Sequence, residues 1–300
     1  MIKHLTHAQI DKAAWDARCR ASANAHWYGL SATLDAAAPG WNALVDEETG
    51  EQMPLPWRSK LGVKYGYQPF MVQHCGPWSP GVCDVSRFLA AIPKIYRYAD
   101  IYVVYDRAAA VSHVKFEERR NHVLDLRPGL EAVRAGYSTN HRRSLRKAEK
   151  SDVEGPTPAS AKEVGTFLEH SAQFREWGIT PEQVATMQRI FHSSENNGSG
   201  FGRVVKHAGK PVAMAWFATF QGTLVFLKGM ASAEGREVSA LHKLIDGTIG
   251  EHCGTHAQMD LAGGNETDLA RFYSGFGGLT VVYLRALMNR LPPIVRKLKQ

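Results

Sequence analysis

A single carboxylate stands at a place where a sheet would open onto a cleft. Asp260 lies near the end of an apolar run, residues 257–261, and Ala262-Gly263-Gly264 follows at once. Since glycine turns sharply at no steric cost, we expect this carboxylate at the carboxyl end of a short strand, where clefts form in α/β sheets. There it could accept the proton of an attacking amine or orient that amine. Capping of the glycine turn would use the same side chain equally well.

Two other side chains could take part in moving a proton. Tyr273 lies in a predicted helix over residues 268–276, where it could hold a donor or stack on it. A core aromatic at helical spacing would look the same. His242 lies in a predicted helix over residues 238–252 and has no carboxylate partner in view, so a histidine without a catalytic role is favoured there. The candidate catalytic residues are therefore Asp260 and Tyr273.

A turn of small residues offers a site for a phosphate-bearing donor. Residues 232–235 join a predicted strand, 223–231, to the helix over 238–252. Backbone N–H groups and the positive end of the helix dipole would face an anion there, and basic side chains could add charge. An ordinary strand–helix turn is the alternative. The candidate donor-binding residues of this region are Lys228, Ser232, Gly235, Arg236 and Ser239.

Candidates for binding an acceptor come from the first half of the chain. Residues 54–78 are rich in aromatic and proline residues, which form rigid pocket walls or pack a sheet edge against a partner domain. The polar candidates in this stretch are Arg58, Lys60, Lys64 and Tyr67.

A basic helix is predicted over residues 138–150. It places Arg143, Lys147 and Lys150 on one side, at helical spacing. Arg143 is the acceptor-binding candidate here, because such a helix could hold a phosphate of the donor or the acceptor. A solvated helix face crossing between two domains is the alternative.

The elements that must position these residues occur in the same order twice: two helices, three strands, a helix and a strand. A repeated order of this kind predicts tandem copies of one domain. In the first half the predicted helices cover residues 8–23, 27–38 and 84–98, and the predicted strands 42–45, 51–56, 67–74 and 101–105. In the second half the predicted helices cover 159–177, 181–194, 238–252 and 268–276, and the predicted strands 201–207, 212–220, 223–231, 257–261 and 280–284. A single large α+β sheet without a repeat is the alternative.

Two segments resemble the FemABX-like branch of the GNAT acyltransferase superfamily. Residues 138–148 follow that branch's pattern Ser-x-Asn-x-Arg-Arg-x-x-Arg-Lys-Ala. Residues 260–263 and 272–278 are similar to its Asp-Phe-x-Gly and Phe-Lys-x-x-Phe-Gly-Gly patterns. The resemblance implies an α/β fold with mixed sheet, built from two tandem GNAT-like domains, 1–136 on the acceptor side and 137–300 on the acyl-donor side. The basic helix 138–150 would lie at the crossing, and Phe272 joins the donor-binding candidates.

The sequence departs from the family at two positions that concern the donor. Tyr273 stands where the family has a lysine that helps to bind aminoacyl-tRNA, which disfavours that donor. The usual GNAT phosphate loop, Arg/Gln-x-x-Gly-x-Gly/Ala, is reduced to Gly235 and small neighbours, which disfavours coenzyme A. Acyl-CoA and aminoacyl-tRNA therefore both stay open as co-substrates, and no tightly bound cofactor is expected.

Composition excludes several other classes of protein. Of the residues, 44% are hydrophobic and 22% charged, as in ordinary globular proteins. No apolar run approaches the roughly 18 residues of a membrane span, and the first residues lack the apolar core of a signal peptide, so a cytoplasmic protein without stable membrane insertion is expected. The histidines and cysteines show no metal-ligand spacing, and the four cysteines are expected to be reduced and mostly buried thiols.

The leading hypothesis is an N-acyltransferase acting on a small-molecule, amino-acid or peptide amine, with tRNA possible as donor. The net charge of +7 favours anionic partners. The alternative is a non-catalytic GNAT-derived module that binds RNA or an anionic membrane surface. The basic tail after residue 290 is expected to be a flexible end. The oligomeric state does not follow from the sequence.

Overall fold

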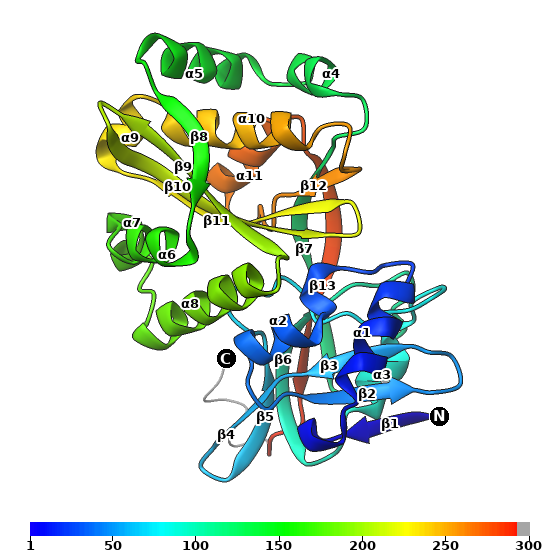
Figure 1. The fold of residues 1–300 in the computed structure, drawn as a ribbon. Helices are drawn as coiled ribbons and strands as arrows, with labels where there is room; N and C mark the ends of the chain where they lie inside the picture. Colours follow the sequence, from blue (N-terminus) through cyan, green and yellow to red (C-terminus); the bar gives the residue numbers. More distant parts are fainter. Residues whose placement is uncertain (293–300) are drawn as a thin grey trace. The chain divides into compact units, whose positions relative to one another are not determined.

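The chain folds into two compact units in the computed structural model, which describes residues 1–292 (Figure 1). Unit 1 comprises Met1–Arg119 and the described residues from Val282 on, and unit 2 comprises Arg120–Val281. The chain therefore passes from one unit to the other twice. The tail expected to be a flexible end lies, after residue 292, outside the described residues. The division into two copies after residue 136 stays a prediction.

Unit 1 contains two sheets and three α-helices. The strands β1, β2 and β3 form an antiparallel sheet, and a second sheet has the order β4-β5-β6-β13, with β5 and β6 parallel. The strands are β1 (Ile2–Leu5), β2 (Asn42–Asp46), β3 (Gln52–Leu55), β4 (Trp57–Lys60), β5 (Val63–Tyr67) and β6 (Tyr96–Val103), and the helices are α1 (Lys12–Ala21), α2 (Ser31–Ala37) and α3 (Val85–Ala91). Two further strands, β7 (Val114–Asp125) and β13 (Leu279–Asn289), run from one unit into the other.

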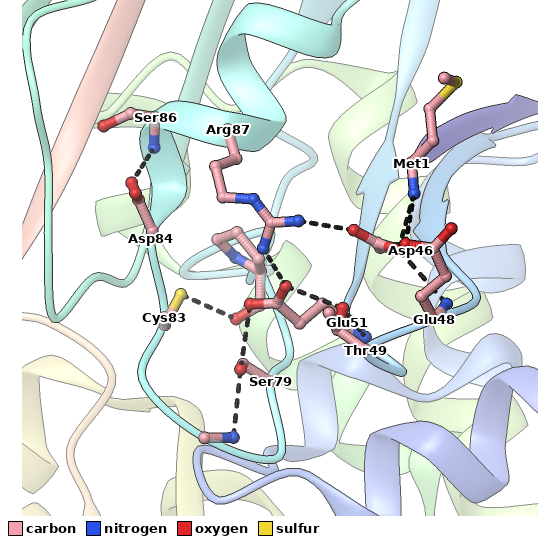
Figure 2. A network of polar contacts seen from close by, with 12 residues as sticks. Met1, Asp46, Glu48, Thr49, Glu51, Ser79, Cys83, Asp84, Ser86 and Arg87 are labelled. Atoms are coloured by element: carbon pink, nitrogen blue, oxygen red, sulfur yellow. Dashed lines mark hydrogen bonds and ion pairs between the residues drawn. The ribbon is translucent and has the colours of Figure 1, made fainter.

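A network of buried charges ties α3 of unit 1 to its three-stranded sheet (Figure 2). The guanidinium of Arg87 donates to Asp46 Oδ2 at 2.6 Å and also to Glu51. Both carboxylates are buried, whereas Arg87 is partly exposed. Glu51 in turn accepts from the Ser79 hydroxyl at 3.2 Å. Because a buried carboxylate is costly unless it is paired and hydrogen-bonded, Arg87 neutralises charges that β2 and the turn after it bring inside.

Unit 2 is one sheet covered by helices on both faces. Its strand order is β7-β12-β11-β10-β9-β8, in which only β11 and β12 are parallel. The strands are β8 (Glu154–Ala159), β9 (Gly200–His207), β10 (Lys210–Phe220), β11 (Thr223–Ala231) and β12 (Gln258–Asp260). The helices are α4 (Leu130–Ala135), α5 (Thr139–Lys150), α6 (Ala161–Glu169), α7 (Ala172–Glu176), α8 (Pro181–Asn196), α9 (Ala233–Glu237), α10 (Ala240–His252) and α11 (Thr267–Ser274).

Alternate residues of β10 show which helices cover which face of this sheet. Ala213, Ala215 and Phe217 belong to a core cluster with residues of α10 and α11. Trp216 points the other way, because successive side chains of a strand face opposite sides, and it stacks on Phe191 of α8 at 4.8 Å. Helices α6 to α8 thus lie on one face and α10 and α11 on the other (Figure 1).

A β-bulge in β11 changes the alternation at one point. Phe217 pairs with Phe226 and Trp216 pairs with Lys228, so Leu227 has no partner on β10. A bulge of this kind bends its strand and increases the local twist. Gly229 leaves room for the turned side chains, because a Cβ atom there would lie 2.7 Å from the Phe226 ring. Lys228 consequently shares the face of Trp216, the face covered by α6 to α8.

The predicted elements agree with the structure best in unit 2 and are wrong at several places in unit 1. The predicted strand 67–74 is wrong, because the chain is already in β5 at Val63 and leaves it after Tyr67. The predicted helix 84–98 begins as expected, with Asp84 accepting from Ser86 N–H at 3.0 Å, but ends at Ala91. Pro93 cannot continue a helix, and β6 follows. Strands β1, β4 and β7, and β8 of unit 2, were not predicted.

Two predicted helices of unit 2 are interrupted. Residues 159–177 form α6 and α7, because Ser171 caps a new helix by accepting from Phe174 N–H. The helix expected over 238–252 begins at Ala240, and the short α9 precedes it. The basic helix, α5, is present, and it lies inside unit 2 packed on α10. Three of the four cysteines, Cys19, Cys75 and Cys83, are buried as expected.

The network around Arg87 leads to a stability prediction. Replacement of Arg87 by methionine removes the counter-ion of buried Glu51 and leaves buried Asp46 with the N-terminal ammonium, 3.3 Å away. Arg87→Met should therefore lower the free energy of unfolding by about 3 kcal/mol. Lys3→Met is the matched control, since Lys3 and Glu47 form an ion pair in which both side chains are exposed. It should cost less than about 1 kcal/mol. Urea unfolding of the full chain measures both, and equal effects would contradict the assigned role.

Candidate functional site

A cavity opens in unit 2 where β11 parts from β12. The two strands pair only from Thr223 to Val225 and from Gln258 to Asp260. β11 continues to Ala231, whereas the chain turns away after Asp260. The cavity in this gap has a volume of about 790 Å³. It begins at Phe226, the residue just before the bulge, so the bend of β11 and the opening coincide.

Four segments of unit 2 line this cavity. They are β11 from Phe226 onwards, the α7 region, the stretch from α9 into α10, and α11 with the turn before it. Six of the predicted site residues are among the lining residues: Lys228, Gly235, Arg236, Ser239, Phe272 and Tyr273. Two more, Ser232 and Asp260, are close in the chain but do not line it. The structure thus brings most of the predicted donor-binding residues to one cavity.

The α9–α10 end of the cavity is built by two successive caps. The Ser232 hydroxyl accepts from Gly235 N–H at 3.0 Å and begins α9. Gly235 packs so closely on β10 that a Cβ atom would lie 2.1 Å from the Val212 carbonyl oxygen. Ser239 adopts a left-handed conformation with φ +58° and begins α10. The predicted phosphate turn is therefore a one-turn helix, and the start of α10 is the longer helix terminus that the cavity reaches.

An aromatic wall closes the cavity on the α11 side. Phe272 lies 5.1 Å, ring centroid to centroid, from His242 of α10. Burial, and then the positive charge of His141, lower the pKa of His242 to about 4, so this imidazole is neutral at pH 7. Burial, and then the negative charge of Asp260, raise the pKa of Tyr273, so its phenol stays protonated. From the sequence, His242 was considered and a histidine without a catalytic role was favoured, because nothing there signals that the first turn of α10 reaches the cavity.

Asp260 holds the turn that separates β12 from the cavity. It is 4% exposed, and its Oδ1 accepts from Ala262 N–H at 2.6 Å and from the Asn121 side chain at 2.9 Å. Asn121 Oδ1 accepts in turn from Gly263 N–H at 2.8 Å. This is the capping geometry that the sequence offered as one of two uses. A catalytic role for Asp260 stays a prediction, which would be exerted through the charge felt by Tyr273.

The fold recurs in known structures, although no protein-family model and no curated protein matches the chain. A crystal structure of FemX matches with a TM-score of 0.69 and 11% identity, over 99% of this chain and 100% of the other. The chain has the fold of FemX. The predicted FemABX-like, tandem GNAT fold is thereby confirmed as a fold.

Two other structures share the FemX fold with this chain. The C-terminal domain of a putative lysylphosphatidylglycerol synthetase from Agrobacterium fabrum matches with a TM-score of 0.55 and 10% identity, over 93% of this chain and 92% of the other. L-PGS from Bacillus licheniformis matches with a TM-score of 0.53 and 11% identity, over 96% and 95%. No helix within residues 1–292 has both the length and the apolar character that crossing a membrane requires.

The far end of the cavity lies on the other face of the FemX-like sheet. Lys228, placed there by the bulge, has its Nζ 4.3 Å from the centre of the Trp177 ring and 5.9 Å from that of Phe174. Trp177, at the end of α7, is 55% exposed. Burial lowers the pKa of Lys228 to about 8. The sequence had grouped Lys228 with the phosphate turn, but the start of α10 is on the opposite face.

The predicted acceptor residues lie away from this cavity along the chain. Arg58, Lys60, Lys64 and Tyr67 all belong to the β4–β5 hairpin of unit 1. There the Arg58 guanidinium lies 4.3 Å from the Tyr67 ring centre, and Lys64 Nζ lies 4.3 Å from that of Trp57. Arg143 is exposed on α5 of unit 2. None of the five lines the cavity, and their role in binding stays a prediction.

The lowered pKa of Lys228 predicts how stability changes with pH. A lysine whose pKa is lower in the folded than in the unfolded chain destabilises the fold fully below its folded pKa, and the penalty fades as the pH rises to the unfolded value. Lys228→Met should therefore raise the free energy of unfolding by about 2 kcal/mol at pH 7, and the gain should shrink from about pH 8 upwards.

Urea unfolding at a series of pH values measures this gain. Lys210→Met, in the exposed β9–β10 turn, is the control and should change stability little at any pH. A destabilised Lys228→Met variant at pH 7 would refute the assigned cost of the buried ammonium.

Proposed function

We propose that the chain is an N-acyltransferase that moves an acyl or aminoacyl group from acyl-CoA or aminoacyl-tRNA to an amine. The observation that carries the proposal is the cavity between β11 and β12, which gathers cationic, polar and aromatic side chains in a fold shared with FemX. Both donors are phosphate-bearing, and both present a carbonyl group that an amine can attack. The acceptor is a small-molecule, amino-acid or peptide amine.

The donor's phosphate group would bind where α10 begins. Arg236 and Ser239 line the cavity there, and Arg236 is exposed at its rim. The first N–H groups of a helix have no partner inside the helix, and they face an anion favourably. An arginine adds a charge-assisted hydrogen bond that a phosphate can accept in a bidentate way. The acyl end of the donor would then reach along the unpaired edge of β11 toward Tyr273.

The transfer itself requires a neutral amine, a base that takes one proton from its nitrogen, and an acid that gives one proton to the leaving sulfur or oxygen. The amine nitrogen attacks the carbonyl carbon, the bond from that carbon to sulfur or oxygen breaks, and the amine proton leaves. His242 is neutral at pH 7 and would take the proton from the amine nitrogen. The carboxylate of Asp260, whose charge reaches Tyr273, would favour the positive charge that develops on the attacking amine. The protonated phenol of Tyr273 would donate to the leaving sulfur or oxygen. Arg58, Lys60, Lys64, Tyr67 and Arg143, none of which lines the cavity, are proposed to contact parts of the acceptor that extend beyond it.

Donor binding provides the first test. In calorimetric titrations of the full chain, coenzyme A or a short tRNA acceptor-stem mimic should bind with a Kd below about 1 mM. Arg236→Met should weaken that binding by about 10-fold or more, because a charge-assisted hydrogen bond is lost. Lys210→Met, which removes an exposed charge that does not line the cavity, should not.

A different pattern would favour the other function considered from the sequence. If neither donor binds below millimolar concentrations and no acyl transfer is seen, the acyltransferase proposal fails. Binding of RNA or of anionic vesicles with a steep salt dependence would then indicate a non-catalytic module.

Substitution of Asp260 distinguishes a catalytic role of this residue from mere support of the turn after β12. Asp260→Asn keeps an acceptor for Ala262 N–H but removes the charge, so turnover should fall by about 10²-fold or more with little change in melting temperature. Asn121→Ala is the matched control: it breaks the same turn, at a cost of about 1–2 kcal/mol, and leaves the carboxylate in place. Transfer assays and melting curves of both variants are needed. Unchanged turnover in Asp260→Asn would leave Asp260 with a capping role alone.

A further inference from the structure

A lysine without an acidic partner stands in the cavity. Lys228 forms no ion pair within residues 1–292, and its ammonium rests on the ring of Trp177. Two acidic residues line the same cavity, Glu266 and Asp268, but both are exposed at the start of α11, and Asp268 contacts Arg271 at 3.3 Å. The positive charge of Lys228 is thus met by an aromatic face instead of a carboxylate.

This arrangement is costly for the protein alone. A cation on an aromatic face gains roughly 0.5–2 kcal/mol, whereas removing an ammonium from water without an anion costs more. Its surroundings are apolar, since Phe174, Leu227 and Met230 are all buried. An anion placed beside Lys228 would offset the cost, and the open mouth next to Trp177 gives it access.

An anion bound at Lys228 would lie at a different end of the cavity from the donor's phosphate. The bulge at Leu227 turns Lys228 to the α6–α8 face of the sheet, as its pairing with Trp216 shows. Arg236 and Ser239 lie at the other end, next to α10 and the core cluster of the opposite face. A donor held at α10 therefore leaves the Lys228 end for the second substrate.

Building on the acyltransferase proposal, we infer that Lys228 and Trp177 form a subsite for a carboxylate carried by the amine acceptor, so that the acceptor class is amino acids and their relatives. The ammonium would pair with the carboxylate, and the flat indole would lie against the carbon skeleton. One ammonium suits a planar group with a single charge, whereas phosphate is usually held by several donors or by a bidentate arginine. The apolar lining of the cavity would contact the remaining, uncharged part of the acceptor.

Binding of matched acids and amides tests this subsite without any acyl donor. The full chain is labelled with carbon-13 at the lysine ε-carbons, and the Lys228 resonance is assigned by its absence in Lys228→Met. The probes are glycine, β-alanine and γ-aminobutyrate, each compared with its amide. At least one acid should shift the Lys228 resonance and bind about 10-fold or more tightly than its amide, as expected for a partly buried charge pair.

Three variants locate the effect. Lys228→Met should bind acid and amide within about 2-fold of each other, whereas Lys228→Arg should keep the preference for the acid, because the charge remains. Arg236→Met, which removes the cation at the other end, should also keep it. For Lys228→Met, whose own resonance is gone, protein tryptophan fluorescence reports the binding.

Three results would overturn the inference. The first is equal binding of every acid and its amide to the unaltered chain, or no binding below about 50 mM. The second is a preference for the acid that disappears in Arg236→Met and survives in Lys228→Met. The third is a shift of the Lys228 resonance by inorganic phosphate or coenzyme A in Arg236→Met, which would assign Lys228 to the donor. Failure of acyl transfer alone would refute the proposed reaction and leave this binding result standing.

Discussion

The pairing between β11 and β12 ends after three residues, and the cavity of unit 2 depends on this. Three residues of each strand pair, and then an extra residue in β11 bends that strand away. Parallel strands that stayed paired would leave no space between them. Because they part, a cavity reaches from one face of the sheet to the other, and the helices on each face contribute their own side chains to it. The separation of an anion site at α10 from the Lys228 end is a direct result.

The buried charges of the two units differ in how they are satisfied. Asp260 is buried, but its carboxylate is held by the turn after β12 and by Asn121. In unit 1, Arg87 plays the corresponding part for Asp46 and Glu51. Lys228 faces the rings of Trp177 and Phe174. Asp46, Glu51 and Asp260 thus have ion-pair or hydrogen-bond partners, whereas the ammonium of Lys228 faces aromatic rings inside a cavity. That contrast separates a residue available for binding from structural ones.

Much of unit 2 could be predicted from the sequence because its signals are local. Ala208-Gly209 and Gln221-Gly222 adopt positive φ angles at the two hairpin turns, and these turns fix the strands on either side. The family-like segments led to the fold of FemX. The face on which Lys228 lies could not be predicted, because the bulge arises from pairing with β10 and leaves no mark on the hydrophobic pattern. The same holds for His242, whose place in the cavity depends on where α10 begins, and for the loop after Tyr67, which carries aromatic residues typical of a strand.

Leu227 also bears on how such a protein could change in evolution. Every other residue from Phe226 to Ala231 keeps a partner on β10, so loss of the one codon for Leu227 would leave the hairpin register intact. It would remove the bend, and a straight β11 could stay beside β12 and fill the gap. A lineage could therefore exchange a ligand site for a flat, continuous sheet through a single in-frame deletion, without passing through an unfolded ancestor. The reverse step, insertion of one residue, would open a cleft in a sheet that had none.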